Sequence, residues 1–151
     1  MNKQLPTALA LILTVACTTA SDTHIEYVAT PNAWTSNHHA RLSYHPSDTM
    51  TSYDIDVLLR HSERYQYNNI ALVVSPSDTT LSVDTLRTTL ADSLGHWLSD
   101  GVSIHSATIP YARRATFKDT TPVHFDITPA LDVDTLHNIL ELGIQITPST
   151  L

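Results

Sequence analysis

The strongest constraint on the fold is an alternation of apolar and polar residues that recurs in short segments along the chain. Successive side chains of an extended strand point to opposite faces, so a period of two gives one apolar and one polar face. Segment 53–60 shows the pattern most fully, and only Leu58 breaks it. The same alternation occurs in segments 40–45, 70–74, 123–128 and 140–146. Several strands with one apolar face each predict sheets that pack face to face.

Turn-forming residues separate these segments. Proline occurs together with aspartate, asparagine, serine or threonine at 30–32, 45–48, 75–78 and 118–122. We therefore expect an all-β fold, an antiparallel two-sheet β-sandwich of the immunoglobulin-like or jelly-roll-like kind, with at most one or two short helices. The length of 151 residues suits one such domain, over residues 24–151.

Two segments leave the choice between strand and helix open. The first residues of segment 81–98 alternate as in a strand, whereas its later leucines and Trp97 recur at helical spacing. A strand that changes phase near Thr85, through a bulge or bend, would explain both patterns and is the preferred interpretation; a short helix is the alternative. Segment 133–138 is a second candidate for a helix of one or two turns, with an aspartate as its cap.

The beginning of the chain has the features of an export signal. Lys3 supplies a positive charge, residues 5–16 are almost wholly apolar, and no further charge occurs before Asp22. This apolar run is too short for a helix that crosses the bilayer, which needs about 20 residues. A short apolar run behind a basic start is typical of a signal peptide, which we place at residues 1–16.

Cys17 indicates which kind of signal this is. It is the only cysteine, it ends the apolar run, and it follows the small residue Ala16. The sequence Thr14-Val15-Ala16-Cys17 resembles a lipobox, at which bacteria attach diacylglycerol to the thiol and cleave before the cysteine, although leucine is usual where Thr14 stands. A thioether to lipid explains an unpaired cysteine in an exported protein. The alternative is an ordinary signal peptide and a buried free thiol.

The charge balance limits how the mature chain attaches to a membrane. The formal net charge of the whole chain is −7, and removal of residues 1–16 takes away Lys3 and no acid, which gives −8. The acidic balance of the chain argues against nucleic acid as a partner. It also argues against membrane binding through a cluster of basic side chains on anionic lipid. The lipid on Cys17 is then the membrane anchor, and residues 17–23 form its tether.

The residues that carry enzyme chemistry do not occur in recognised patterns. Nine histidines are scattered without an HExxH motif or cysteine partners, so we expect no metal site and interpret them as exposed neutral side chains. Asp54 and Asp56 share a strand face with Arg60, which indicates cross-strand charge partners more than a catalytic pair. No GxSxG turn or glycine-rich phosphate loop occurs. We therefore expect no catalytic residues and no cofactor beyond the covalent lipid.

Glycine is very sparse, and we expect each glycine to be required by the backbone. The chain has three, Gly95, Gly101 and Gly143. A glycine is needed where φ is positive or where another chain segment approaches too closely for a Cβ atom. Gly95 and Gly101 flank Trp97 and Leu98, and Gly143 interrupts the last apolar alternation.

The chain contains four distinctive blocks of sequence, and the three glycines lie in the last two of them. The blocks are Pro31-Asn32-Ala33-Trp34, then Leu59-Arg60 followed by Tyr65-Gln66-Tyr67-Asn68-Asn69, then Asp92 to Gly101, then Leu140 to Ile146. In their order and spacing, together with the lipoprotein signal, the blocks resemble the gliding-motility lipoprotein family GldH of the Bacteroidetes. The chain is similar to a divergent member, because residues 102–121 match poorly and Ser99 and Ser103 stand where glycine would be usual.

The resemblance implies an accessory role in the envelope machinery of gliding motility, which is linked to type IX secretion. Its partners would be other envelope proteins of that machinery, and it brings no catalytic residues. Surface-exported lipoproteins of this phylum tend to carry a run of acids after the cysteine. Only Asp22 stands there, so we expect a lipid-anchored protein of the cell envelope that faces the periplasm.

The candidate binding surface combines the aromatic residues of these sequence blocks, Trp34, Tyr65, Tyr67 and Trp97. Core packing and turn closure are the alternative roles of these side chains. A glycan-binding sandwich is the second functional hypothesis, because exposed coplanar aromatic rings stack on sugars. A hydrolase is the third, and would need a cleft with a nucleophile and a base.

Overall fold

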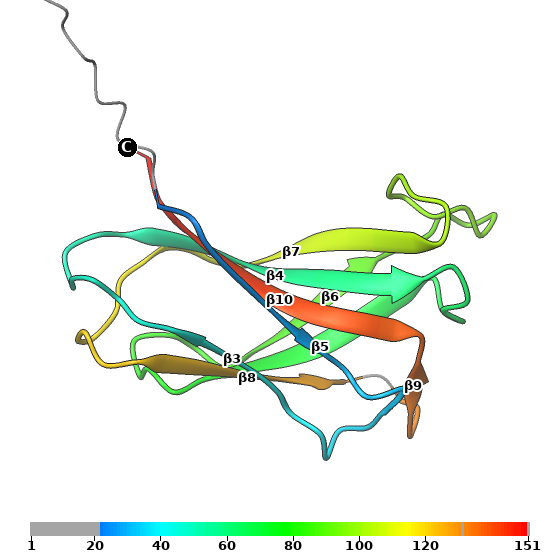
Figure 1. Ribbon diagram of the computed structural model, residues 1–151, viewed down its shortest axis with the longest axis horizontal. Coiled ribbons are helices and arrows are strands. Elements are labelled where there is room, and N and C mark those ends of the chain that lie inside the picture. The colour runs from blue at the N-terminus through cyan, green and yellow to red at the C-terminus, as the bar shows by residue number, and fades with distance from the viewer. Residues whose placement is uncertain (1–21, 131, 151) are drawn as a thin grey trace, which may run out of the picture.

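The computed structural model describes residues 22–130 and 132–150 (Figure 1). Cys17, the predicted signal peptide and most of the predicted tether lie outside the described residues. The described part contains strands and no helix, which confirms the prediction of an all-β fold with sandwich-like sheets. The strands are β1 (His24–Ala29), β2 (Ala33–Trp34), β3 (Ala40–Tyr44), β4 (Tyr53–Ser62), β5 (Asn69–Pro76), β6 (Asp84–Thr89), β7 (Ile104–Ala115), β8 (Val123–Pro129), β9 (Leu136–His137) and β10 (Ile139–Pro148).

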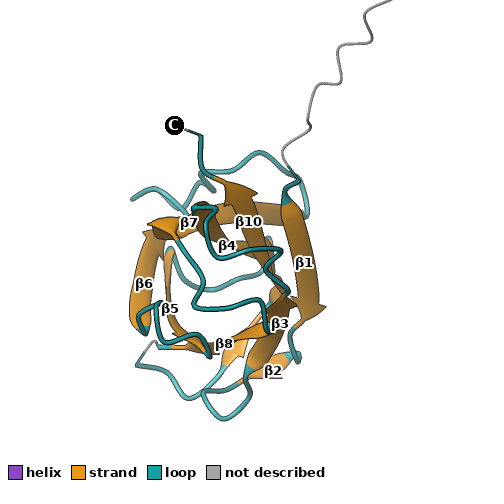
Figure 2. Cartoon of the chain, turned by 90° about the vertical axis from the view of Figure 1, so that its left-hand side faces the viewer, coloured by secondary structure: helices purple, strands orange, loops and turns teal. Residues whose placement is uncertain are grey.

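Two four-stranded sheets form the two layers of the sandwich. The first has the strand order β1-β10-β4-β7 and the second has the order β3-β8-β5-β6. All neighbours pair in the antiparallel sense, and β2 with β9 forms a further two-stranded sheet. Seen along the strands, the two layers enclose the core, with β1 beside β3 on one side and β7 near β6 on the other (Figure 2).

The core is made by the inward residues that the alternation of the sequence predicts. In β4 these are Tyr53, Ile55, Val57 and Leu59, and all four are buried. They meet inward residues of the other strands, among them Leu42, Ile70, Leu72, Phe125, Ile127, Leu142, Ile144 and Ile146. Each such side chain contributes roughly 1.5–3 kcal/mol through its removal from water.

The ambiguous segment 81–98 contains a strand, β6, followed by a loop. Leu81 and Val83 precede β6, and the inward residue Leu86 lies in the opposite phase, so the change of phase falls near the start of the strand. At the end of β6 the amides of Leu90 and Ala91 both donate to the carbonyl of Asn68, at 2.7 and 3.1 Å, so two consecutive residues face one partner. This second irregularity allows both Leu90 and Ala91 to be buried.

The helix expected over residues 133–138 is not present, and that expectation was wrong. Leu136 lies in β9 opposite Trp34 and is fully buried there. Asn138 follows with a φ of 66°, a left-handed conformation that turns the chain into β10. Pairing with β2 buries Leu136 more completely than one isolated helical turn would.

Two edge strands of the first sheet, β1 and β7, have no clear signal in the sequence. In β1 the apolar side chains of Ile25 and Tyr27 face solvent, while Glu26 is one of the half-buried residues on the inner face. In β7 the inward positions include His105, and Pro110 lies within the strand beside a shift of register with β4. An edge strand tolerates proline because only one side of it needs backbone partners.

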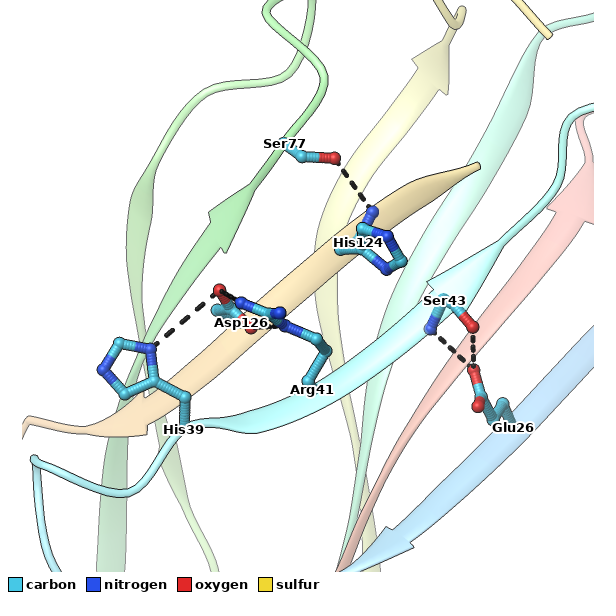
Figure 3. Close-up of polar contacts among 7 residues, drawn as sticks. All are labelled: Glu26, His39, Arg41, Ser43, Ser77, His124 and Asp126. Atoms are coloured by element: carbon cyan, nitrogen blue, oxygen red, sulfur yellow. Dashed lines mark hydrogen bonds and ion pairs between the residues drawn. The ribbon is translucent and has the colours of Figure 1, made fainter. Parts of the chain in front are cut away.

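Glu26 joins the two sheets along one side of the sandwich. Its Oε2 atom accepts hydrogen bonds from the backbone amide of Ser43 at 2.7 Å and from the Ser43 hydroxyl at 3.4 Å (Figure 3). The carboxylate therefore occupies a donor at the edge of β3, which limits pairing with another chain there. Farther along the outer face of the second sheet, Arg41 and Asp126 form a two-pronged ion pair at 2.7 and 2.8 Å (Figure 3).

The two ends of the sandwich differ in the loops and chain segments that they carry. At the tether end, β1 begins and β10 ends, with His24 opposite Ile146, so the chain leading to Cys17 joins the domain here (Figure 1). At the opposite end, which we call the distal end, β4 finishes at Ser62 and β7 begins at Ile104. The loops after β4 and after β6 lie together at the distal end (Figure 1).

Candidate binding site at the distal end

Three of the four aromatic residues singled out in the sequence meet at the distal end. The ring of Tyr65 lies 5.6 Å from that of Tyr67 and 6.5 Å from that of Trp97, measured between centroids. The Tyr65 hydroxyl donates to the carbonyl of Asn69 at 3.1 Å and so fixes the turn after β4. Together with Gln66, Asn68, Ala91 and Gly95, these three residues line a cavity of about 210 Å³, which we call the aromatic groove.

Trp34 does not join this groove. Its side chain is 0% exposed, it belongs to the core, and its Nε1–H donates to the carbonyl of His38 at 2.8 Å. For Trp34 the structure therefore supports the alternative role of core packing, and the candidate surface loses one member. Tyr65 is also buried, whereas Tyr67 and Trp97 are half-buried and reach the surface.

The loop that carries Trp97 is held by Asp92. One carboxylate oxygen accepts from the backbone amides of Leu94 and His96, both at 2.9 Å, and the other lies 3.2 Å from the His96 ring. The bond from the His96 amide is the largest cause that holds the pKa of Asp92 below its usual range. The amide of Leu98 donates to the Leu90 carbonyl at 2.9 Å, which closes residues 90–98 into a small hairpin.

Gly101 closes the same loop before β7. Its φ is +150°, and a Cβ atom on it would lie 2.2 Å from the carbonyl oxygen of Ile104. The backbone of the loop therefore packs directly on the start of β7 at a position where no side chain fits.

Four exposed apolar side chains lie in the short segment that leads from the Trp97 loop into β7. Leu94 is 79% exposed, Leu98 63%, Val102 87% and Ile104 53%. We call residues 94, 98, 102 and 104 the apolar rim. Several exposed apolar residues in one short segment of a folded domain are typical of a contact surface. Sequence reasoning placed Leu94 in a possible helix or strand and missed the rim. The available signal was Leu98 between the two loop glycines, with Leu94 and Val102 directly outside them.

Two buried histidines lie beneath Trp97. His61 on β4 and His105 on β7 are direct cross-strand partners, and their rings stack at 5.5 Å with planes 25° apart. The Trp97 ring lies 4.5 Å from the His61 ring and 5.4 Å from the His105 ring. The expectation that the histidines are exposed is wrong for this pair, since both are at most 4% exposed. The period-two pattern of β4, extended by one step beyond Leu59, would have placed His61 inward.

Hydrogen bonds to backbone carbonyls indicate which nitrogen of each ring carries a proton. Nδ1 of His61 lies 3.0 Å from the carbonyl oxygen of Ser62, and Nδ1 of His105 lies 3.3 Å from that of Ser99. A carbonyl only accepts, so each Nδ1 carries the proton and donates. Burial is the largest cause that lowers the pKa of His61, and the neighbouring His105 lowers it further.

The acidic pair considered for catalysis has structural partners at the other end of the sandwich. Asp56 pairs with the Arg113 guanidinium at 2.6 Å, and Asp54 accepts from the Arg114 amide and the Ser149 hydroxyl. Within residues 22–130 and 132–150, no three histidine, cysteine or acidic side chains group as metal ligands would.

Gly143 is required by a packed side chain on the outer face of the first sheet. A Cβ atom there would lie 2.7 Å from Cδ1 of Tyr27, whose ring crosses the glycine. The Arg60 guanidinium lies 4.3 Å from the centroid of the same ring and forms an ion pair with Glu141 at 2.9 Å. The fourth sequence block, residues 140–146, therefore fixes the edge strand β1 onto the sheet.

The comparison with protein families agrees with this arrangement of sequence blocks. The model of the GldH lipoprotein family matches residues 23–146, which includes every described strand residue up to Ile146. The chain belongs to the GldH lipoprotein family. This GldH-family chain is thereby related to lipoproteins linked to gliding motility, a family not known for enzymatic activity.

No curated protein in a second comparison matched the chain. The part of this GldH-family lipoprotein that the structure describes has no helix long and apolar enough to cross a membrane.

Proposed function

We propose that the protein is a noncatalytic accessory lipoprotein of the gliding machinery and its linked type IX secretion apparatus. It is held in the membrane by lipid on Cys17, faces the periplasm, and acts by binding another envelope protein with its distal end. The family supports the lipoprotein and the link to gliding, and the surface of the distal end supports the binding role.

The observation that carries the proposal is the exposed apolar rim at the distal end, in the segment that also contributes Trp97 to the aromatic groove. Exposure of these side chains to water is unfavourable, at roughly 25 cal/mol for each Å² of apolar surface, and a partner that covers them recovers that energy. The loop beneath is well ordered by the bonds to Asp92 and by the hairpin pairing, so little conformational entropy is lost when a partner binds.

The position of this surface also fits a partner other than the anchoring membrane. Six residues, 18–23, separate Cys17 from β1, and they span at most roughly 20 Å when fully extended. The tether joins the tether end, and β10 alone, with its ten residues, runs roughly 33 Å toward the distal end. An upright domain therefore presents the rim away from the lipid surface.

The ring geometry favours an apolar side chain in the groove over a sugar. A glycan platform needs exposed, nearly coplanar rings, but Trp34 and Tyr65 are buried. The planes of Tyr65 and Trp97 differ by 38°, and those of Tyr65 and Tyr67 by 68°. Rings at such angles form a concave pocket that fits a leucine or aromatic side chain of a partner protein.

The proposal is tested with a pair of matched double substitutions in the native lipoprotein. Leu94→Ser with Leu98→Ser removes half of the apolar rim, while Met50→Ser with Val83→Ser alters two equally exposed apolar residues in loops at the tether end. Both proteins are expected to remain folded, because exposed positions contribute little to stability.

Gliding, secretion and co-purification of envelope proteins after crosslinking are the readouts. Only the rim variant is expected to lose the co-purified gliding or secretion components and the associated function. Equal retention of those components by both variants would refute binding through the distal end.

A further inference from the structure

Two buried histidines, His61 and His105, lie beneath the Trp97 loop, residues 90–98. We propose that His61 is an acid sensor that releases the Trp97 loop, and with it the apolar rim, when its ring becomes protonated. Acid-induced opening of the loop needs no partner and can be measured on the isolated protein. Only its consequence, a change in partner binding, rests on the proposed function, because this loop carries the proposed binding surface.

Trp97 is the only large side chain of the loop that packs on both histidine rings. It lies at 4.5 Å from His61 and 5.4 Å from His105, between centroids. The loop is joined to the start of β7 by the bond from His105 Nδ1 to the Ser99 carbonyl, and the Ser99 hydroxyl also accepts from the Ser106 amide at 3.3 Å. The loop therefore packs on the two histidine rings and is hydrogen-bonded to one of them.

A second proton on His61 has no partner in this position. With Nδ1 donating to the Ser62 carbonyl, the added proton goes to Nε2, and no hydrogen bond to Nε2 is present among the described residues. The side chains that face the ring are Tyr65 from the turn after β4, Trp97 from the loop and His105 from β7. None of these is a carboxylate.

The charged residues next in sequence do not compensate the charge. Glu63 and Arg64 follow His61 in the same turn, and both are exposed to solvent. A buried cation without a counter-charge is unfavourable, so the protonated ring gains free energy by reaching water. The ring is only 1% exposed beneath Trp97, so movement of the loop gives the protonated ring fuller contact with water.

One interaction opposes this effect. Tryptophan attracts a cation placed over its face, by roughly 0.5–2 kcal/mol. The His61 ring lies 4.5 Å from the Trp97 ring with the planes tilted by 59°, so this attraction reduces the response to acid. Burial remains the largest cause that lowers the pKa of His61.

The size of the effect follows from proton linkage. Because the closed loop lowers the pKa of His61 from its ordinary 6.5, acidification to pH 5 favours the open form. The upper limit is about 30-fold, which would apply to a ring that is never protonated while the loop is closed. At pH 7.5 the same linkage is negligible. The effect is present only below the ordinary pKa, because the folded pKa is the lower of the two.

Amide hydrogen exchange of the full chain at pH 7.5 and pH 5, corrected for intrinsic rates, measures this opening. The Leu98 amide, which donates to the Leu90 carbonyl, reports on the loop, and amides of the β10–β4 ladder report on global unfolding. We expect the Leu98 amide to lose protection by up to about 30-fold at pH 5 while the ladder amides do not.

Three variants complete the experiment. His61→Phe and His61→Gln both remove the titrating group, and the glutamine amide keeps a donor for the Ser62 carbonyl if the phenylalanine variant does not fold. His96→Asn is the control, because His96 is an exposed histidine of the same loop beside Asp92. The acid response should vanish in the His61 variants and persist in the control.

An acid response that persists without His61, or a Leu98 amide equally protected at both pH values, would overturn the inference. These outcomes are separate from the proposed function. Loss of partner capture at pH 7.5 concerns the binding role, whereas loop opening is measured without any partner.

Discussion

A Cβ atom added at Gly143 tests how β1 is fixed to the first sheet. In Gly143→Ala, the new methyl group would lie 2.7 and 2.8 Å from two ring carbons of Tyr27 and 2.9 Å from the carbonyl oxygen of Glu26. Separations below 3 Å force the ring to move, and overpacking of this kind costs about 1–3 kcal/mol. Displacement of the ring also weakens its contact with the Arg60 guanidinium, worth roughly 0.5–1 kcal/mol at an exposed site.

A double-mutant cycle separates the clash with the ring from other effects of alanine. In a Tyr27→Ala background the ring is absent, and alanine in place of glycine in a strand is favourable by roughly 0.5–1 kcal/mol. The Glu26 carbonyl contact remains and offsets part of this gain, so Gly143→Ala should there be nearly neutral. We expect a coupling free energy of about 1–3 kcal/mol between the two positions.

Urea unfolding of the full-length protein, followed by far-ultraviolet circular dichroism, gives the four free energies of unfolding. Tyr27→Phe is the matched control, because it keeps the ring and removes only the hydroxyl. Gly143→Ala should remain costly in that background. Additive effects of Gly143→Ala and Tyr27→Ala would refute the account of this glycine.

Three further predictions concern single positions. Gly101→Ala should destabilise the distal loop by at least about 1–3 kcal/mol, seen as faster amide exchange there, because its Cβ atom would lie 2.2 Å from the Ile104 carbonyl oxygen. Glu26→Ala should cost about 1–3 kcal/mol in urea unfolding by leaving the Ser43 amide without its acceptor, and Glu26→Gln should cost less. Burial alone would raise the pKa of Asp78, but local hydroxyl and amide donors outweigh it and lower that pKa below 3.8. Its stabilisation is therefore present above pH 3.8 and lost as the pH falls through the folded value, so acid unfolding of Asp78→Asn should depend less steeply on pH.

The strands of the core were predictable because each alternates strongly and lies inside a sheet. Segments 53–60, 123–128 and 140–146 carry apolar residues at every inward position. Strands β1 and β7 were not predictable in the same way. An edge strand packs only partly against its neighbours, so its sequence need not alternate strictly. Ile25 therefore faces solvent in β1 and His105 faces the core in β7, and both segments still form strands.

The aromatic groove was predictable in part, but the two buried histidines beneath Trp97, His61 and His105, were not. Tyr65 and Tyr67 are close in sequence, and the glycines beside Trp97 indicated a loop that brings it back to the domain. Trp34 carried the same sequence signal as Trp97 and is buried, because opposite Leu136 it fills the core between β2 and β9. The contact of His61 with His105 depends on the register of β4 with β7, which alternation alone does not determine.

The central claim is that the distal end of the sandwich binds an envelope protein while the tether end stays near the membrane. Its most direct test is a photo-crosslinking amino acid placed in intact cells at Leu98 and, in a separate strain, at Met50, both exposed apolar positions. We predict that Leu98 gives a discrete crosslink to a component of the gliding or secretion machinery and that Met50 does not. The same protein crosslinked from Met50 alone, or no discrete protein from Leu98 in gliding cells, would contradict the claim.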